Sequence, residues 1–332
     1  MANKKFYNAL NKVPQTTPPI WFMRQAGRYH SHYQQFKKKY TFEQLCKNPE
    51  LAAEVACGPV EEFDFDVAIL FSDILFVLEG LGLELEFKPG PVFKEHITSE
   101  NYKRFNNVER AIEHMGFQKN AIKITRQRLA KSKSLIGFVG GLWTVMRFAT
   151  GHNKENNNFQ SYYSDFMATT LLEVIKKNIQ LQLDAGAEIV MMFDSGIKDL
   201  NDSYFKNEYK KFLINISSSF PNKIGYYVKG KEYNQIQHLT KLPFAGLGID
   251  SGISLQDVFS DSKFGFIQGN FNESHLLLDS KKLSNELNKF SDYLKSFESL
   301  NGWVCGLGHG INKYTPEKNV HLFIETIRKK FS

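Results

Sequence analysis

Two arginines four residues apart are the first residues along the chain whose type and spacing suggest chemistry. They are Arg24 and Arg28, in the stretch WFMRQAGRY at residues 21–29, and a short apolar run precedes them. A guanidinium donates two parallel hydrogen bonds to a carboxylate or phosphate, so two of them on one helical face would clamp an anion. On spacing alone, a pair of surface arginines or a structural ion pair is an equally good interpretation.

Three further side chains have a setting that suggests a role in a site. Asp73 lies in ILFSDIL, where the apolar flanks predict a partly desolvated carboxylate that needs a partner, although an N-cap of a helix is the alternative. His309 lies between two glycines, which allow close approach of the backbone to a ligand, but a lone histidine is often structural. Ser195 follows MMFD and is a candidate for binding through its hydroxyl, with no neighbouring histidine to make it a nucleophile.

The elements that must position these residues alternate along the chain. Apolar or β-branched runs predict eight strands, at 19–22, 67–71, 135–138, 189–193, 224–228, 246–249, 264–267 and 303–305. Helical periodicity fills much of the space between them, at 42–63, 111–129, 162–183, 204–216 and 283–297, and Thr315-Pro316-Glu317 starts a helix that ends near Lys330. Eight strands alternating with helices favour a single (β/α)8 barrel of parallel strands over residues 1–332. The alternative is an open doubly wound sheet with an appended domain, but no Gly-x-Gly-x-x-Gly turn follows the first strand.

Polar and glycine residues follow every predicted strand. They lie at 23–28, 72–73, 140–144, 194–196, 229–230, 250–251, 268–270 and 306–310. Because the carboxyl ends of the strands of such a barrel meet at one mouth, we expect the active site there. Lys229 and Asp250 either pair with each other or bind a ligand, and 268–270 is expected to be a structural turn.

Composition narrows the functional classes. The chain has 332 residues, 42% of them apolar and 23% charged, which is ordinary for a globular protein, and no apolar run reaches the length of a membrane span. The N-terminus has no apolar signal region, and the three cysteines have no paired spacing, so we expect a cytoplasmic protein without a disulfide framework. We find no P-loop, no HExxH, no metal-spaced histidines or cysteines and no nucleic-acid module. The formal charge of +7 is interpreted as a solvated basic surface.

The motifs at the strand ends resemble, in the same order, those of the uroporphyrinogen decarboxylase family. The matching stretches are WFMRQAGRY (21–29), FSDIL (71–75), GFVGGLWT (137–144), FDS (193–195), YVKG (227–230), LGID (247–250), QGN (268–270) and LGHG (307–310). RQAGRY and FSDIL are specific to the family, the other stretches less so. The resemblance runs from about residue 6 to residue 328.

The resemblance implies a cofactor-free, metal-free barrel enzyme that usually works as a homodimer. Such an enzyme converts the four acetate side chains of uroporphyrinogen III, an octacarboxylate, to methyl groups, giving coproporphyrinogen III and CO2. It implies that Arg24, Gln25, Ala26, Gly27 and Arg28 bind substrate, with the arginines holding carboxylates. It further implies that Asp73 faces the pyrrole N–H groups at the centre of the macrocycle. Ser195 and His309 would contact further propionate or acetate groups.

The implied chemistry fits the residues present. A pyrrole protonated on its ring carbon is a cation that accepts the electrons released with CO2, so no other electron sink is needed. An anionic Asp73 would stabilise that cation, and the arginines would orient the substrate. Arg24, a bound water and His309 stay open as the proton donor, although a guanidinium is a very weak acid.

The sequence departs from the family pattern at several positions. Phe148 stands where the family usually has a tyrosine whose hydroxyl touches substrate and aspartate, and Arg147 beside it could supply another carboxylate contact. Ser251 replaces a tryptophan, and Leu78 replaces a proline.

Two other functions stay open on the sequence. One is a zinc- and cobalamin-linked methyltransferase of the same fold, which needs a His-x-Cys where this chain has Val228-Lys229-Gly230. The other is a non-catalytic tetrapyrrole-binding relative.

Overall fold

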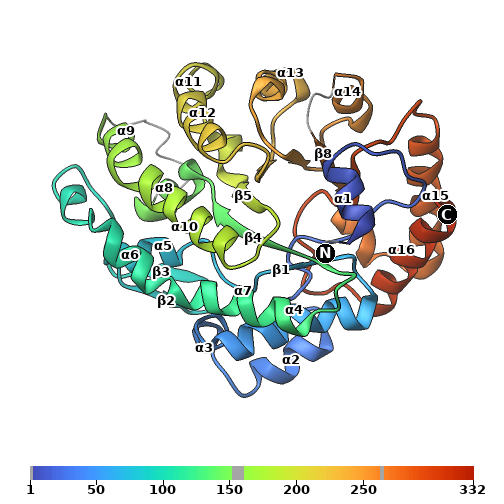
Figure 1. The fold of residues 1–332 in the computed structure, drawn as a ribbon, viewed down its shortest axis with the longest axis horizontal. Coiled ribbons are helices and arrows are strands. Elements are labelled where there is room, and N and C mark those ends of the chain that lie inside the picture. Colours follow the sequence, from blue (N-terminus) through green and yellow to red (C-terminus); the bar gives the residue numbers. More distant parts are fainter. Residues whose placement is uncertain (1–2, 152–160, 262–264) are drawn as a thin grey trace.

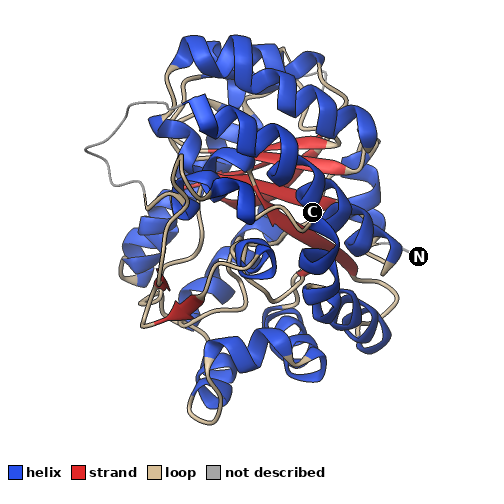
Figure 2. Cartoon of the chain, turned by 90° about the vertical axis from the view of Figure 1, so that its left-hand side faces the viewer, coloured by secondary structure: helices blue, strands red, loops and turns tan. Residues whose placement is uncertain are grey.

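A closed barrel of parallel strands forms the centre of the molecule. The structure, a computed structural model, describes residues 3–151, 161–261 and 265–332. Its main sheet has the order β1-β4-β5-β6-β7-β8-β9, and every neighbouring pair is parallel. The strands are β1 (Val67–Ile69), β4 (Ser134–Gly140), β5 (Val190–Asp194), β6 (Ile224–Val228), β7 (Gly246–Ile249), β8 (Phe266–Phe271) and β9 (Trp303–Leu307). Figure 2 shows these strands at the centre, with helices around them.

The eighth strand predicted from the sequence, residues 19–22, is reduced to one bridge. Ile20 pairs in parallel with Cys305 of β9, and the Asp66 N–H donates to the Ile20 carbonyl at 3.0 Å on the other side. The segment therefore joins β9 to β1 and closes the (β/α)8 barrel. A full strand was the wrong prediction, because Pro18 and Pro19 donate no hydrogen bond and the Ile20 N–H bonds to the Asp66 side chain. Phe264, which the sequence assigned to the seventh strand, lies outside the described residues.

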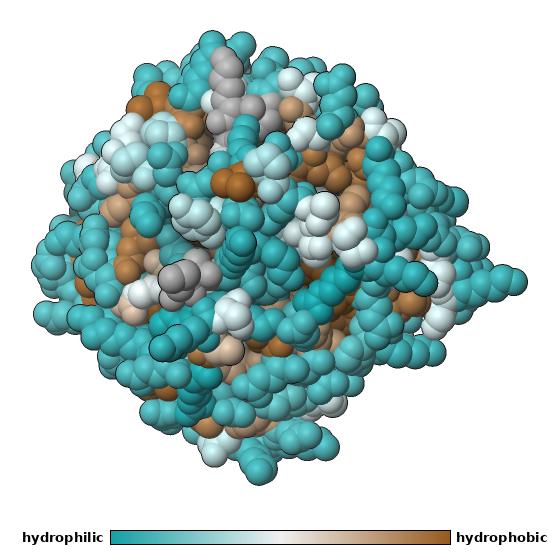
Figure 3. Space-filling view, turned by 45° about the vertical axis from the view of Figure 1, so that its right-hand side comes forward, coloured by the Kyte–Doolittle hydropathy of each residue, from teal (hydrophilic) through white to brown (hydrophobic). Residues whose placement is uncertain are grey.

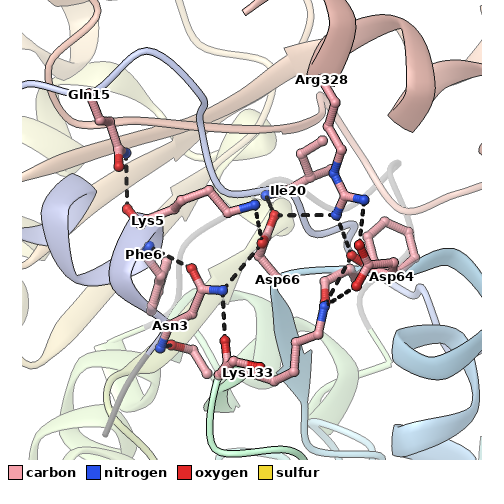
Figure 4. Close-up of polar contacts among 12 residues, drawn as sticks. Asn3, Lys5, Phe6, Gln15, Ile20, Asp64, Asp66, Lys133 and Arg328 are labelled. Carbon is pink, nitrogen blue, oxygen red and sulfur yellow. Dashed lines mark hydrogen bonds and ion pairs between the residues drawn. The ribbon is translucent and has the colours of Figure 1, made fainter. Parts of the chain in front are cut away.

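A buried carboxylate holds this closure at the amino end of the strands (Figure 4). Asp66 accepts hydrogen bonds from the Ile20 N–H at 2.9 Å and the Asn3 amide at 3.2 Å. It also pairs with Lys5 at 2.5 Å, and Arg328 lies 3.9 Å away. A buried charge is tolerated when ion pairs and hydrogen bonds surround it. Asp66 thus ties the N-terminal segment and the last helix to the start of β1.

Side chains on each strand alternate between the barrel interior and the surrounding helices. The interior cluster includes Trp21, Met23, Val67, Ile69, Ile136, Met191, Tyr227, Phe266 and Val304. Phe6 and Ala9 of α1 (Lys4–Leu10) complete this cluster at the amino end. The alternate residues, among them Ala68, Leu135, Val190, Leu247 and Ile267, pack against the helices. The described side chains therefore fill the interior, and we expect a ligand at the carboxyl-end mouth.

Helices surround the sheet, as the periodicity predicts (Figure 1). Two predicted stretches are each split in two: 42–63 becomes α3 (Phe42–Lys47) and α4 (Pro49–Phe63), with Asn48 capping α4, and 111–129 falls on α6 (Val108–His114) and α7 (Gly116–Arg128). The others are α2 (Ser31–Lys37), α5 (Phe76–Leu81), α8 (Leu142–Ala149), α9 (Ser161–Phe166), α10 (Leu172–Asp184), α11 (Asp202–Tyr204), α12 (Lys210–Ser219), α13 (Tyr233–Ile236), α14 (Leu255–Ser260), α15 (Ser280–Lys295) and α16 (Glu317–Lys330). Short 3-10 or π segments are η1 (Tyr102–Arg104), η2 (Met167–Leu171), η3 (Ser195–Asp199), η4 (Phe205–Tyr209), η5 (Gln237–Lys241) and η6 (Glu273–Leu277).

A small hairpin outside the barrel was not predicted. It pairs β2 (Leu85–Phe87) with β3 (Pro91–Phe93) in antiparallel fashion, and it lies near α5 and α6 in Figure 1. Lys88, Pro89 and Gly90 form the turn, and such a Pro-Gly pair is a hairpin signal in the sequence.

The surface is polar. On the face in Figure 3, hydrophilic residues predominate and hydrophobic ones form small scattered areas. Among the described helices, none has the length and apolar character that crossing a membrane requires.

Candidate active site

The segment that carries the two arginines is a series of turns and not a helix. Arg24 has φ of 63°, in the left-handed region, which breaks any helical path from Arg24 to Arg28. Gln25 causes this geometry, since its buried amide donates to the Val67 carbonyl at 2.9 Å and accepts from the Phe22 N–H at 3.0 Å. The Gln25 side chain, a predicted substrate contact, is therefore committed to holding the turn on β1.

Both arginines point their charge toward solvent. Arg24 and Arg28 are exposed, and neither forms an ion pair with any described residue. A structural ion pair, one of the alternatives from the sequence, is thus not seen in the described part of the chain. Ala26 and Gly27 between them are half-buried, and a Cβ on Gly27 would lie 2.8 Å from the Arg24 carbonyl oxygen. The turn that presents Arg24 therefore requires a glycine at 27.

Asp73 combines burial with an incompletely satisfied carboxylate. It follows β1, is half-buried, and accepts one hydrogen bond from the Leu75 N–H at 2.9 Å. Burial raises the pKa of Asp73 to about 6, against the opposing effects of the Leu75 hydrogen bond and the Arg24 charge. Arg24 is near enough to act on Asp73 but does not pair with it. The predicted desolvation is confirmed, and one carboxylate oxygen has no hydrogen bond from a described residue.

His309 is held on a tyrosine at the bottom of the mouth. The Tyr227 hydroxyl lies 2.8 Å from the Gly308 carbonyl and 3.1 Å from His309 Nδ1, and the two rings are stacked. Burial lowers the pKa of His309 to about 4, and the charges of Lys229, Arg24 and Lys198 act in the same direction. His309 is consequently neutral at pH 7, with three cations around it.

The glycines beside His309 serve packing within the protein. A Cβ on Gly308 would lie 2.4 Å from the Ser251 backbone nitrogen, and one on Gly310 would lie 2.5 Å from Arg24 Cδ. The sequence suggested that these glycines let a ligand approach; the structure shows neighbouring loops in that space.

Ser195 and Phe148 reach the same end of the barrel from different elements. Ser195 directly follows β5, is half-buried, and its hydroxyl forms no hydrogen bond with a described residue. Phe148 on α8 is 39% exposed, which is unusual for a phenylalanine. Arg147 beside it forms an ion pair with Asp199, so its charge is already neutralised within the protein.

One residue that supports the site was missed by sequence reasoning. Asp194 is fully buried, and its two carboxylate oxygens accept hydrogen bonds from Thr144 at 2.7 Å, Tyr209 at 2.5 Å and Tyr226 at 2.9 Å. The Thr144 N–H also donates to it, and burial raises the pKa of Asp194. Asp194 thus locks the end of β5, and with it Ser195, to α8. In the sequence, an acidic residue directly after the four apolar residues 190–193 could have indicated a buried carboxylate.

Lys229 and Asp250 do not pair with each other. Asp250 accepts hydrogen bonds from the backbone N–H groups of Gly230 at 2.6 Å and Gly252 at 3.0 Å. The Asn270 amide donates to the carbonyls of Asp250 and Ile253, which agrees with a structural role for residues 268–270. Within residues 3–151, 161–261 and 265–332, no three histidine, cysteine or acidic side chains converge as metal ligands would.

The chain is similar to known proteins along almost its whole length. The family model described as "Uroporphyrinogen decarboxylase (URO-D)" matches residues 1–330. A uroporphyrinogen decarboxylase of Orientia tsutsugamushi (strain Ikeda) is 35% identical, with 99% of both chains covered, and one of Francisella tularensis subsp. novicida is 29% identical, with 98% covered. Among solved structures, a methyltransferase from Methanosarcina mazei has a TM-score of 0.78 at 17% identity, with 99% of both chains covered. That structural likeness extends to the fold alone.

Proposed function

The chain belongs to the uroporphyrinogen decarboxylase family, and from this premise we propose that it converts the acetate side chains of uroporphyrinogen III to methyl groups. The products are coproporphyrinogen III and CO2, so the enzyme is a carboxy-lyase of porphyrin biosynthesis. One observation at the site supports this reaction above others. Asp73, a half-buried carboxylate with one oxygen unoccupied by described residues, lies near an exposed Arg24 that has no ion pair there.

The arginine segment binds the substrate carboxylates. Arg24 and Arg28 are cations without partners among the described residues, and a guanidinium can donate two hydrogen bonds to one carboxylate. The turn at 24–28 is tied to β1 through Gln25, so the arginines start from a fixed backbone. Preorganised donors lose less freedom on binding an anion, which favours a large polyanionic substrate.

The ring itself accepts the electrons of decarboxylation. Protonation of the ring carbon next to the one that carries the acetate arm forms an iminium-like cation. The bond between the methylene of the arm and its carboxylate then breaks, and its electron pair forms an exocyclic C=C bond conjugated to that cation. CO2 leaves, protonation of the exocyclic methylene carbon gives the methyl group, and loss of the proton first added to the ring restores the pyrrole. Ionised Asp73 stabilises the cation at the pyrrole N–H groups, where the positive charge develops.

His309 acts in binding and is a poor proton donor. Its pKa of about 4 leaves it neutral at pH 7, so it has no proton to give from an imidazolium. The Tyr227 hydroxyl donates its one hydrogen to the Gly308 carbonyl, so Nδ1 of the neutral ring carries the imidazole hydrogen and donates to the hydroxyl oxygen. Nε2 is then a hydrogen-bond acceptor for a group of the substrate or a water. Because a guanidinium is also a very weak acid, we propose that a water bound at the mouth relays the proton from solvent to the ring.

The remaining features follow the family pattern. We propose that residues 1–332 form one domain, that the protein works in the cytoplasm as a homodimer, and that the reaction needs neither metal nor cofactor. The family match over residues 1–330 supports the single domain.

An anaerobic turnover assay tests the function. Purified protein treated with a chelator is incubated with uroporphyrinogen III, and the products are oxidised and separated by their number of carboxyl groups. We expect porphyrins with seven to four carboxyl groups to accumulate without any additive. A strict requirement for zinc or cobalamin would instead indicate the methyltransferase, and binding without turnover would indicate a non-catalytic relative.

A further inference from the structure

Three polar residues lie side by side at the ends of neighbouring strands. Asp194 of β5 pairs with Val228 of β6, and Val228 pairs with Ile249 of β7. Each strand ends at this level, so the next residues, Ser195, Lys229 and Asp250, begin the loops next to one another at the mouth. Lys229 therefore lies beside Ser195, which the family resemblance places at the substrate.

The alternation along β6 directs Lys229 toward the barrel axis. Tyr226 faces the helix layer, where it bonds to Asp194, whereas Tyr227 belongs to the interior cluster and reaches His309. Val228 faces the helix layer again. Successive side chains alternate along a strand, so Lys229 continues on the side of Tyr227, one level nearer the mouth.

The backbone on the C-terminal side of Lys229 is firmly held. Gly230 has φ of 67°, and its N–H donates to Asp250 at 2.6 Å. Lys231 is buried and bonds to Asp202 at 2.6 Å and to the Leu200 carbonyl at 2.8 Å. The backbone of Lys229 is therefore held on both sides, by Val228 at the end of β6 and by Gly230 and Lys231. This limits the positions that its ammonium group can reach.

The charge of Lys229 has no counterpart in the described structure. Lys229 is half-buried and forms no ion pair with any described residue, and the adjacent Asp250 carboxylate is occupied by two backbone N–H groups. Lys198 adds a second cation, because its side chain packs on Gly230, where a Cβ would lie 2.6 Å from Lys198 Cβ. Lys198 is exposed, whereas the half-buried ammonium of Lys229 needs an anion to offset its desolvation.

Lys229 and Lys198 approach His309 from β6 and the loop after β5, whereas Arg24 approaches it from the segment before β1. All three charges act on the His309 ring. The mouth thus carries cations from two separate groups of loops, and a substrate with carboxylates around its rim could meet both.

We propose that Lys229, with Lys198 beside it, binds a second carboxylate of the substrate, distinct from those held by Arg24 and Arg28. This inference rests on the proposed function, since it assigns one rim carboxylate of the tetrapyrrole to the loops after β5 and β6. Lys229 acts in binding and orientation, so its loss affects substrate affinity more than the chemical step.

The test compares Lys229→Met with Lys229→Arg and with Lys223→Met. Lys223 is an exposed lysine immediately before β6, at the opposite end of the same strand, and is the matched control. We expect Lys229→Met to raise KM for uroporphyrinogen about tenfold, the effect of one lost charge-assisted hydrogen bond, with kcat within about twofold. Lys229→Arg should restore most of the affinity, and Lys223→Met should behave as the wild type does.

A KM for Lys229→Met equal to that of the wild type, or an equal rise in Lys223→Met, would overturn the proposal. So would failure of Lys229→Arg to restore affinity, since charge would then not be the cause. Thermal melting monitors folding, and if Lys229→Met is unstable, the polar variant Lys229→Gln must show the same rise in KM. The wild-type assay tests the proposed function separately, because inactive wild-type protein would refute decarboxylation itself, whereas active wild-type protein with an unaffected Lys229→Met refutes only this subsite.

Discussion

Arg24 lies directly against the α-carbon of Gly310. A Cβ built on Gly310 would come within 2.5 Å of Arg24 Cδ and 3.0 Å of its Cγ and Nε. The loop after β9 thus shapes the position of an arginine that precedes β1, across the point where the barrel closes. The glycine after His309 is needed for this contact, and it couples two motifs from opposite ends of the chain.

We therefore expect Gly310→Ala to impair catalysis with little loss of stability. The added methyl group displaces a flexible side chain, which is a small cost in folding, but misplacing Arg24 by about 1 Å should lower kcat/KM on the order of tenfold to a hundredfold. Gly116→Ala is the control, because nothing lies within 4 Å of its added Cβ. Steady-state kinetics and melting curves of both variants decide the point, and unchanged kinetics in Gly310→Ala would mean that Arg24 does not need this position.

The pH dependence of kcat/KM should have an acidic limb near pH 6. Asp73 has a pKa of about 6 in the free enzyme, and it must be ionised to stabilise a cationic ring, so activity falls as pH drops through that value. His309, with a pKa of about 4, should add no limb between pH 6 and 8. A limb in that range that disappears in His309→Gln would contradict the assignment.

Asp73 should also reduce the stability of the folded protein above pH 6. Its pKa is raised from 3.8 to about 6 by burial, so ionisation disfavours the folded state as pH rises from about 4 to about 6. We expect Asp73→Asn to be more stable than the wild type at pH 8, on the order of 2 kcal/mol, and similar at pH 4. Urea unfolding at the two pH values measures this difference. A variant that is less stable at pH 8 would show that Asp73 is not strained by burial.

Loss of Asp66 should weaken the barrel closure and leave the site unaffected. Asp66→Ala leaves the Ile20 N–H without its acceptor and Lys5 without its partner, so the free energy of unfolding should fall by about 3 kcal/mol. Asp292 on α15 is exposed and serves as the control. Asp292→Ala should change the free energy of unfolding by less than about 0.5 kcal/mol. Equal urea midpoints for the two variants would rule out a role of Asp66 in closure.

Most of the barrel could be predicted because its strands are buried on both faces and read as short apolar runs. The exception was residues 19–22, where apolar Ile20-Trp21-Phe22 has the composition of a strand but the preceding prolines and the Asp66 carboxylate leave a single bridge. The breaks at Asn48 and Met115 depend on caps and packing that an apolar period does not resolve.

The sequence predicts the candidate residues of the site, but it does not predict their contacts. Position after a strand predicts Arg24, Asp73, Ser195 and His309 at one mouth, and in the structure the charge of Arg24 acts on both Asp73 and His309. The turn at 24–28 could not be foreseen, because it depends on Gln25 reaching the backbone of β1, a contact between segments distant in sequence. The Asp194 network was missed for the same reason, since Thr144, Tyr209 and Tyr226 come from three other elements.

The rate of the chemical step in Asp73→Asn is the most direct test of the central claim, that an ionised Asp73 stabilises the cationic ring. Enzyme in excess is mixed anaerobically with uroporphyrinogen III, and the first loss of CO2 is followed in a single turnover. We predict a fall of about a hundredfold or more for Asp73→Asn, with substrate affinity changed only a few-fold. A rate close to that of the wild type would contradict the role assigned to Asp73.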